Sequence, residues 1–199
     1  MTKEMNANLQ KYMAARHEIW NGDLLLFRKR RVGFIDGIIA IAGRGVYSHA
    51  AKAAWWKTDL FCLEVREFHG GRAVGLSSQV ERYPCRIDVF RPNADNRWPD
   101  YDIEGALEVM RRFAGGDYGY LNVLTAAMTH LPFLRIFIRP DRSDEIGSRP
   151  WRPPFCSEAV SIAERIGGGV DPVPHLADRF SEPSDLARSP FYKYLFTLE

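Results

Sequence analysis

The chain has 199 residues, of which 46% are hydrophobic and 13% aromatic, enough for one domain with a sizeable core. Its 27 basic and 25 acidic residues leave a net charge of +2, which excludes the broad basic face that nucleic-acid binding requires. Three cysteines, Cys62, Cys85 and Cys156, are an odd number without CxxC spacing, which argues against a disulfide framework or a zinc knuckle.

The N-terminal residues 1–6 are polar and of mixed charge, and they contain no apolar core of a secretory signal. The longest apolar stretch, 121–138, is interrupted by polar residues, a proline and an arginine, so it makes a poor membrane span. We therefore expect a protein without a transmembrane segment that resides in the cytoplasm, unless release or another export route carries it further. No pattern in the sequence specifies an oligomeric state.

Hydrophobic periodicity predicts the elements in chain order. Apolar residues at helical spacing predict a helical extension over about residues 1–20, laid on the outside of the core. A good amphipathic helix is expected over 102–114, and the segments 35–42 and 121–138 also favour helix. Short apolar runs predict strands over residues 24–27, 46–53, 60–66, 73–76 and 86–91. The tail, 170–199, is rich in proline and serine, and Ser184 is expected to cap one helical turn in it.

Another predicted helix carries a cysteine, Cys156, in its first turn. Pro153 and Pro154 hold the chain extended, and the glycines 167–169 end the helix. Its buried stripe consists of Phe155, Ala159, Ile162 and Ile166. In the first turn, unpaired N–H groups and the helix dipole favour the thiolate of Cys156, as a nucleophile requires. The other interpretation is a small buried apolar residue, which free cysteines often are.

A nucleophilic cysteine needs a base within hydrogen-bond reach and a group that orients the base. Of five histidines, His17 and His69 are expected to be exposed, and His130 and His175 have structural explanations. His49 lies in the middle of a predicted strand among small residues, where another element can approach closely. Taken alone, a strand histidine is more often a satisfied core residue.

The strand 60–66 offers a partner for His49, because Leu60, Cys62, Glu64 and Arg66 share one of its faces. A carboxylate on an apolar strand needs a partner, and an imidazolium is suitable. If Glu64 faces His49 across an antiparallel pair, it occupies one ring nitrogen and leaves the other for Cys156. Cys62 on the same face leaves open a metal site with His49 and Cys156, although scattered spacing is unlike that of structural zinc sites.

Several short motifs occur in a recognisable order, over roughly residues 22 to 188. They are Gly22-Asp23-Leu24, Ser48-His49, Leu63-Glu64, Gly116-Asp117-Tyr118, Phe155-Cys156-Ser157-Glu158 and Pro183-Ser184-Asp185-Leu186. In this order the chain resembles the permuted branch of the NlpC-type papain-like cysteine peptidases, and within it the YiiX/YaeF-like proteins. The family commonly has a proline before the pocket tyrosine, where this chain has Asp117.

The resemblance implies a circularly permuted papain-like fold in which the nucleophile helix follows the strands. It implies Cys156 as nucleophile, His49 as base and Glu64 as orienter, with Tyr118 and Ser48 contacting the substrate, and neither metal nor cofactor. Together with the periodicity it predicts a single α+β domain over 1–199, with an antiparallel sheet of about five strands packed against the nucleophile helix.

The predicted activity is that of a thiol hydrolase that cleaves an amide bond through an acyl-enzyme. A peptide substrate, such as a peptidoglycan peptide of the cell wall, is favoured by the resemblance alone. Hydrolysis of a lipid acyl amide or ester, or acyl transfer, is the second hypothesis, because related families include acyltransferases and segment 121–138 could receive an acyl chain. A third hypothesis, of another class, is a non-catalytic binding module that uses the same cleft.

Overall fold

The computed structural model describes residues 2–29, 45–84, 86–117 and 153–198. Six strands form one open sheet in which every neighbouring pair is antiparallel, in the order β4-β3-β2-β1-β5-β6. The strands are β1 Leu24–Arg28, β2 Tyr47–Trp56, β3 Asp59–Arg66, β4 Gly70–Gly75, β5 Ile87–Pro92 and β6 Tyr192–Leu198. The predicted α+β class is confirmed. The predicted helical segments 35–42 and 121–138, and Cys85, lie outside the described residues.

The sixth strand corrects the prediction of about five. β6 pairs along the edge with β5, and a register shift lies between Val89 and Phe90. For the proline- and serine-rich tail the sequence predicts one helical turn at Ser184 and no strand. The last residues nevertheless combine aromatic and β-branched side chains typical of strands, and an edge strand needs only one partner.

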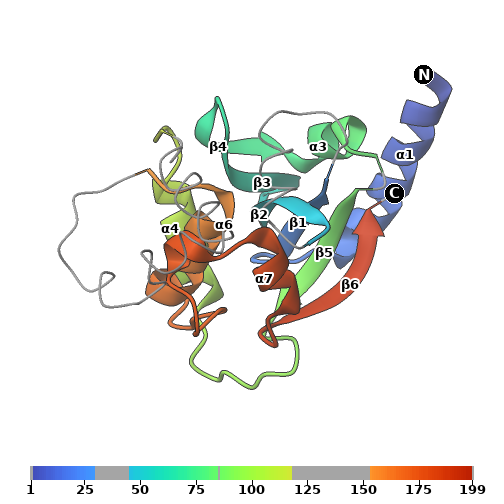
Figure 1. Ribbon diagram of the computed structural model, residues 1–199. Helices are drawn as coiled ribbons and strands as arrows, with labels where there is room; N and C mark the ends of the chain where they lie inside the picture. The colour runs from blue at the N-terminus through green and yellow to red at the C-terminus, as the bar shows by residue number, and fades with distance from the viewer. Residues whose placement is uncertain (1, 30–44, 85, 118–152, 199) are drawn as a thin grey trace.

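Helices cover both faces of the sheet (Figure 1). They are α1 Thr2–Ala15, the short η1 Arg16–Glu18, α3 Leu76–Arg82, α4 Ile103–Arg112, α6 Cys156–Ile162, the π-helical turn η3 Ala163–Gly167, η4 Asp178–Phe180 and α7 Pro183–Arg188. Alternation along β1 places Leu24 and Leu26 in one hydrophobic core, beneath α4, α6 and α7. Leu25 and Phe27 enter the other, on the side of α1 and α3.

Two helix starts show different capping. The side chain of Asp102 accepts a hydrogen bond from the Gly105 N–H at 2.9 Å and caps α4, as its position predicts. At α7 the Asp185 carboxylate accepts from the Glu182 N–H at 2.9 Å, and Ser184 lies inside the helix. The expectation that Ser184 caps this turn is therefore wrong.

The nucleophile helix changes character at its end. α6 passes into η3 at Ala163, and a π-helical turn closes its hydrogen bonds from i to i+5, which rotates the residues beyond it. Ile166, predicted on the buried stripe, is 63% exposed, and Glu164 is fully buried in its stead. The prediction that the apolar stripe continues to Ile166 is wrong for this reason.

Glu164 is the centre of a buried polar cluster on the α6 side of the sheet. Its carboxylate pairs with the ammonium group of Lys52, a residue of β2, and both side chains are fully buried. The hydroxyl groups of Tyr101 and Tyr192 each donate to it at 2.7 Å. The cluster therefore fastens the end of the nucleophile helix to the strand that carries His49.

We expect Glu164→Gln to lower the free energy of unfolding by about 3–5 kcal/mol, because it leaves the Lys52 ammonium buried without a counter-charge. Urea unfolding measures this loss. The matched control is Glu108→Gln, which removes an exposed partner of Arg112 and should cost less than about 1 kcal/mol. Equal losses in the two variants would contradict a buried charge pair at this place.

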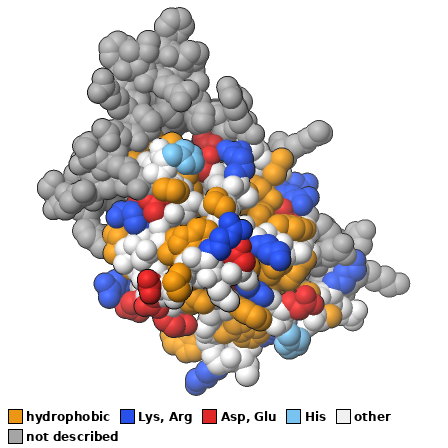
Figure 2. All heavy atoms as spheres, turned by 90° about the horizontal axis from the view of Figure 1, so that it is seen from below, with side chains coloured by type: hydrophobic (Ala, Val, Ile, Leu, Met, Phe, Trp, Pro, Cys, Tyr) orange, Lys and Arg blue, Asp and Glu red, His pale blue; other side chains and the backbone are white. Residues whose placement is uncertain are grey.

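On the face drawn in Figure 2, basic and acidic side chains alternate with hydrophobic ones and form no patch of one sign among the described residues. Across the described ranges, no helix has both the length and the apolar character that crossing a bilayer requires.

Candidate active site

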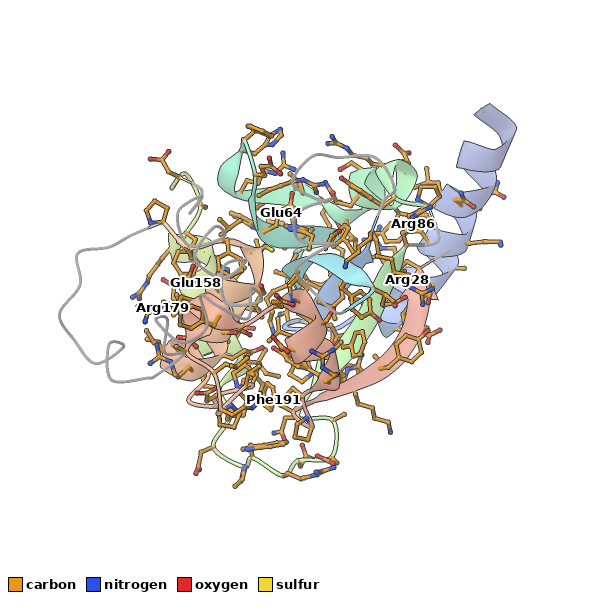
Figure 3. All side chains as sticks on the ribbon, in the orientation of Figure 1. Arg28, Glu64, Arg86, Glu158, Arg179 and Phe191 are labelled. Atoms are coloured by element: carbon orange, nitrogen blue, oxygen red, sulfur yellow. The ribbon has the colours of Figure 1, made fainter. Side chains whose placement is uncertain are left out.

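The cysteine lies at the first residue of α6, as predicted. Phe155 is extended, with φ −95° and ψ 179°, and the helix begins directly after it. The Glu158 carboxylate, labelled in Figure 3, accepts a hydrogen bond from the Phe155 N–H at 3.2 Å. The hydroxyl of Ser157 donates to the Ser181 carbonyl at 2.7 Å and ties the start of the helix to the segment before α7. These contacts fix the backbone on both sides of the Cys156 thiol.

His49 lies near the start of β2, directly opposite Phe27 of β1. The edge of one ring meets the face of the other, with 5.0 Å between centroids. The imidazole Nε2 lies 2.7 Å from Oε2 of Glu64, and the imidazole also shares a hydrogen bond with the thiol of Cys156. Because Nε2 is taken by the carboxylate, Nδ1 is the nitrogen that remains for the thiol.

The register of β2 and β3 brings Glu64 to this histidine along a diagonal. The residue directly opposite Glu64 is Ala51, two positions after His49 on the same face. The small alanine side chain leaves room for the carboxylate to reach across to the imidazole. The predicted pairing of His49 with Glu64 is thus present in the structure, although the two are not direct cross-strand partners.

The electrostatics of the three groups follow from these contacts. Burial alone would raise the pKa of the Glu64 carboxyl, but the hydrogen bond and charge of His49, with two guanidinium groups, hold it at about 2. Burial would lower the pKa of His49, but its hydrogen bonds to Cys156 and Glu64 outweigh this and raise it to about 9.

The pKa of the Cys156 thiol is lowered, whereas that of His49 is raised. Burial would raise the pKa of Cys156, but the hydrogen bond and charge of His49 lower it below the ordinary thiol value. The backbone N–H groups of Ala50 and Ser157 lower this pKa further. The protons of the thiol and the imidazole are coupled, and the arrangement favours a thiolate beside an imidazolium.

The remaining predicted residues divide into two groups. His17 and His69 are exposed, as predicted, and His175, for which a structural role was expected, is exposed as well. Ser48 is half-buried next to His49. Tyr118 and His130 lie outside the described residues, so the predicted contact of Tyr118 with substrate stays a prediction. Cys62 lies beside Glu64, with 3.9 Å between its sulfur and Oε2, as the shared strand face predicts.

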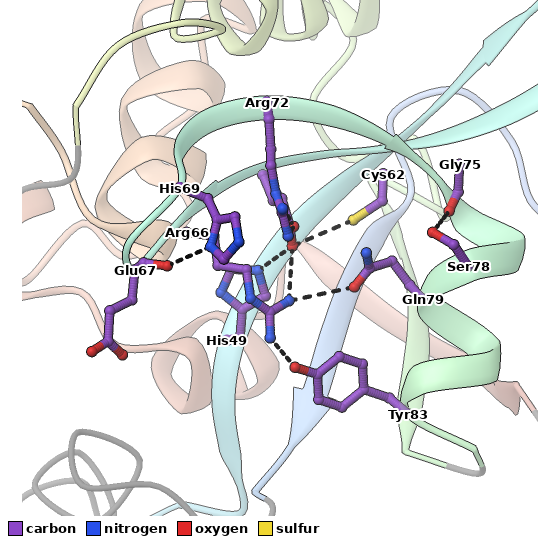
Figure 4. A network of polar contacts seen from close by, with 11 residues as sticks. His49, Cys62, Arg66, Glu67, His69, Arg72, Gly75, Ser78, Gln79 and Tyr83 are labelled. Carbon is purple, nitrogen blue, oxygen red and sulfur yellow. Dashed lines mark hydrogen bonds and ion pairs between the residues drawn. The ribbon is translucent and has the colours of Figure 1, made fainter.

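The contacts of two arginines with Glu64 were not predicted, although Arg66 was expected on the same strand face. Arg72 of β4 donates to Oε1 of Glu64 from Nε at 2.8 Å and from Nη2 at 2.6 Å, and Arg66 reaches Oε2 at 3.4 Å (Figure 4). Folding β3 and β4 into a hairpin places Arg72 directly opposite Glu64. Pairing the two predicted strands as a hairpin could have pointed to Arg72. The short strand predicted over 73–76, however, begins one residue too late to include it.

The fold is similar to that of a solved structure, the metalloprotein YiiX from Escherichia coli O157:H7, with a TM-score of 0.59 and 12% identical residues. The match covers 90% of this chain and 97% of that chain. YiiX is a YiiX/YaeF-like protein, the branch that the sequence motifs indicated. No protein-family model matches the chain, and no curated protein sequence matches it. At this identity the likeness shows a shared fold.

The description of YiiX as a metalloprotein raises the question of a metal here. Among the described residues, no three His, Cys, Asp or Glu side chains are gathered in an arrangement that could hold a metal ion. A cation bound to Glu64 would also face the guanidinium groups of Arg66 and Arg72, which already occupy its two oxygens. His49, Glu64 and Cys156 are therefore a poor ligand set, and their contacts are hydrogen bonds from His49 to each of the other two.

We accordingly expect activity and thermal stability to be indifferent to chelators, because the part of the chain that the structure describes contains no ligand shell for a metal to complete. Elemental analysis of the purified protein, together with unfolding curves with and without a chelator, checks this. Stoichiometric zinc in the protein, or turnover lost on chelation and restored by zinc, would contradict the expectation.

Proposed function

We propose that this chain is a cysteine hydrolase with a circularly permuted papain-like fold of the NlpC type. It cleaves an amide bond, in a peptide such as a cell-wall peptide, through an acyl-enzyme on Cys156. The observation that carries the proposal is the continuous contact from carboxylate to imidazole to thiol, which joins Glu64, His49 and Cys156. Nucleophile, base and orienter in this relation are the elements of covalent acyl transfer.

In the proposed mechanism, the thiol proton passes to Nδ1 of His49, and the Cys156 thiolate attacks the carbonyl carbon of the substrate. The tetrahedral intermediate collapses when the imidazolium gives its proton to the leaving amine, and the acyl group stays on sulfur as a thioester. His49 then takes a proton from water, the resulting hydroxide attacks the thioester, and the carboxylic acid leaves. The Cys156 backbone N–H, at the helix start, is the first donor to the oxyanion.

Turnover of a defined substrate panel tests the proposal. The panel contains peptidoglycan peptides and acyl lipids, each incubated with the protein and with the Cys156→Ser variant. We expect Cys156-dependent release of an amine and a transient acyl adduct on the peptide that contains Cys156, detected by mass spectrometry. Turnover of the lipids alone would favour the lipid acyl hydrolase, and tight binding of a panel member without turnover would favour the binding module.

The pH dependence of kcat/KM should be bell-shaped. The reactive pair requires a deprotonated thiol, so the rate rises as pH passes the lowered pKa of Cys156, below that of an ordinary thiol. It also requires a protonated imidazole, so the rate falls as pH passes about 9, the pKa of His49. A rate that only rises, with its midpoint at the value of a free thiol, would contradict the thiolate–imidazolium pair.

A further inference from the structure

The carboxylate of Glu64 contacts more positively charged groups than the orientation of His49 alone requires. Its side chain is fully buried and contacts one imidazole and two guanidinium groups. A buried carboxylate needs a partner, but His49 alone satisfies that requirement. The two arginines therefore call for an explanation of their own.

The contacts divide the two carboxylate oxygens. Arg72 takes Oε1 with two nitrogens, Nε at 2.8 Å and Nη2 at 2.6 Å. Oε2 is left for His49 at 2.7 Å, with Arg66 at a longer 3.4 Å. Two charge-assisted hydrogen bonds from one guanidinium group anchor Oε1. With Oε1 held on the side of β4, Oε2 is the oxygen that remains directed toward the imidazole.

The arginines are themselves fixed by the fold. Arg72 is the direct cross-strand partner of Glu64, and Arg66 stands two residues after Glu64 on the same face of β3. Arg66 is braced from the α3 side, where it donates to the Tyr83 hydroxyl and lies 5.0 Å from the centroid of that ring. It also reaches Oε1 of Gln79, a buried residue of α3, at 3.4 Å (Figure 4).

We propose that Arg72, supported by Arg66, is a positioning residue that aims one oxygen of Glu64 at His49 and limits how strongly Glu64 holds the imidazolium proton. The inference rests on the proposed function. The charged and titratable groups around Glu64 come from β2, β3, β4 and the α3 side, and Cys156 on α6 faces the other side of the imidazole. They are His49, Cys62, Arg66, Arg72 and Tyr83.

The direction of the effect follows from charge. A guanidinium group close to a carboxylate partly neutralises its negative charge, and the carboxylate then stabilises a neighbouring imidazolium less. Without Arg72, Glu64 stabilises the proton on His49 more strongly but is free to turn away from it. Proton release from His49 should therefore become harder, while the alignment of the pair becomes worse.

The test uses the titration of the His49 ring, followed by NMR and assigned with a His49→Asn variant. Arg72→Gln should move the midpoint upward by about one pH unit. It should also lower kcat about tenfold with KM within roughly a factor of two, as expected for a residue that acts on alignment and not on substrate binding. Arg72→Lys, which keeps the charge but not the paired hydrogen bonds, should leave the midpoint near that of the unaltered protein and restore only part of kcat.

Arg91→Gln is the matched control. Arg91 also donates from Nε and Nη2 to a carboxylate, that of Asp23, at 3.0 and 2.9 Å, with one bond to each oxygen. Its side chain is 18% exposed where that of Arg72 is 22% exposed. Its loss removes an equivalent ion pair from another part of the sheet and should leave the His49 midpoint in place.

A second measurement asks whether Arg72 acts through Glu64. In a double-mutant cycle of Arg72→Gln and Glu64→Gln, the two losses in kcat should fail to multiply, because the second change removes what the first one positions. A His49 midpoint in Arg72→Gln that equals those of the unaltered protein and the Arg91→Gln control would overturn the inference. That result would leave the proposed function standing, whereas full turnover by Cys156→Ser would refute the function and leave the titration to decide on Arg72.

Discussion

Replacing Cys156 with serine should abolish turnover while the fold remains intact. The hydroxyl is close in size to the thiol, so the buried start of α6 keeps its packing. The serine hydroxyl is not ionised by an imidazole as readily as the thiol, so the contact that creates the nucleophile is lost. We expect kcat/KM to fall by several orders of magnitude.

Cys62→Ser is the natural control for this variant. Cys62 is also buried and also lies near Glu64, but its pKa is raised, by burial first and by the charge of Glu64 second. It therefore remains a thiol at neutral pH, and its replacement should leave turnover within a few-fold of normal. Turnover near normal in Cys156→Ser, with an unchanged unfolding curve, would end the interpretation of this chain as a cysteine hydrolase.

Glu64→Gln should lower kcat/KM by roughly tenfold to a thousandfold, less than the loss of the nucleophile. The amide keeps the shape and one acceptor but removes the charge that stabilises the imidazolium. The pKa of His49 should then fall from about 9, and the thiolate–imidazolium pair should shift toward the neutral pair. The variant also leaves Arg66 and Arg72 without their common counter-charge, so unfolding must be measured alongside turnover.

Glu67→Gln separates this effect from a general loss of negative charge. Glu67 follows the end of β3, its carbonyl accepts a hydrogen bond from His69 at 2.9 Å, and its carboxylate points away from the arginines in Figure 4. We expect turnover to be unaffected. If Glu67→Gln reduced turnover and Glu64→Gln did not, the orienting residue would be misassigned.

Where apolar runs are bounded by turns, the sequence predicts this fold well. The strands β1, β2, β3 and β5 and the helix α4 lie where periodicity places them, because each buries a face whose side chains repeat at the period of the element. The start of α6 is equally predictable. Two prolines exclude helix before Phe155, and the apolar stripe begins at Phe155 itself.

The predictions that failed share a physical cause: tertiary contacts, which the local sequence pattern does not contain, determine the structure at these places. Ile166 is exposed because η3 rotates the end of the helix and turns Glu164 toward Lys52, and periodicity contains no information on that rotation. β6 depends on the free edge of β5. Only the register of the β3–β4 hairpin places Arg72 opposite Glu64. The site's three principal residues were identified from chemical type and motif order, whereas its electrostatic setting required the folded sheet.

The rate at which Cys156 is alkylated, as a function of pH, tests the central claim most directly because it needs no substrate. A small haloacetamide is added at each pH, and mass spectrometry follows the separate peptides that contain Cys156, Cys62 and Cys85. The account predicts that Cys156 reacts far faster than Cys62 at pH values below the pKa of an ordinary thiol, and that His49→Asn abolishes the difference. Alkylation of Cys156 that rises only near the pKa of an ordinary thiol, in step with Cys62 and unchanged by His49→Asn, would contradict it.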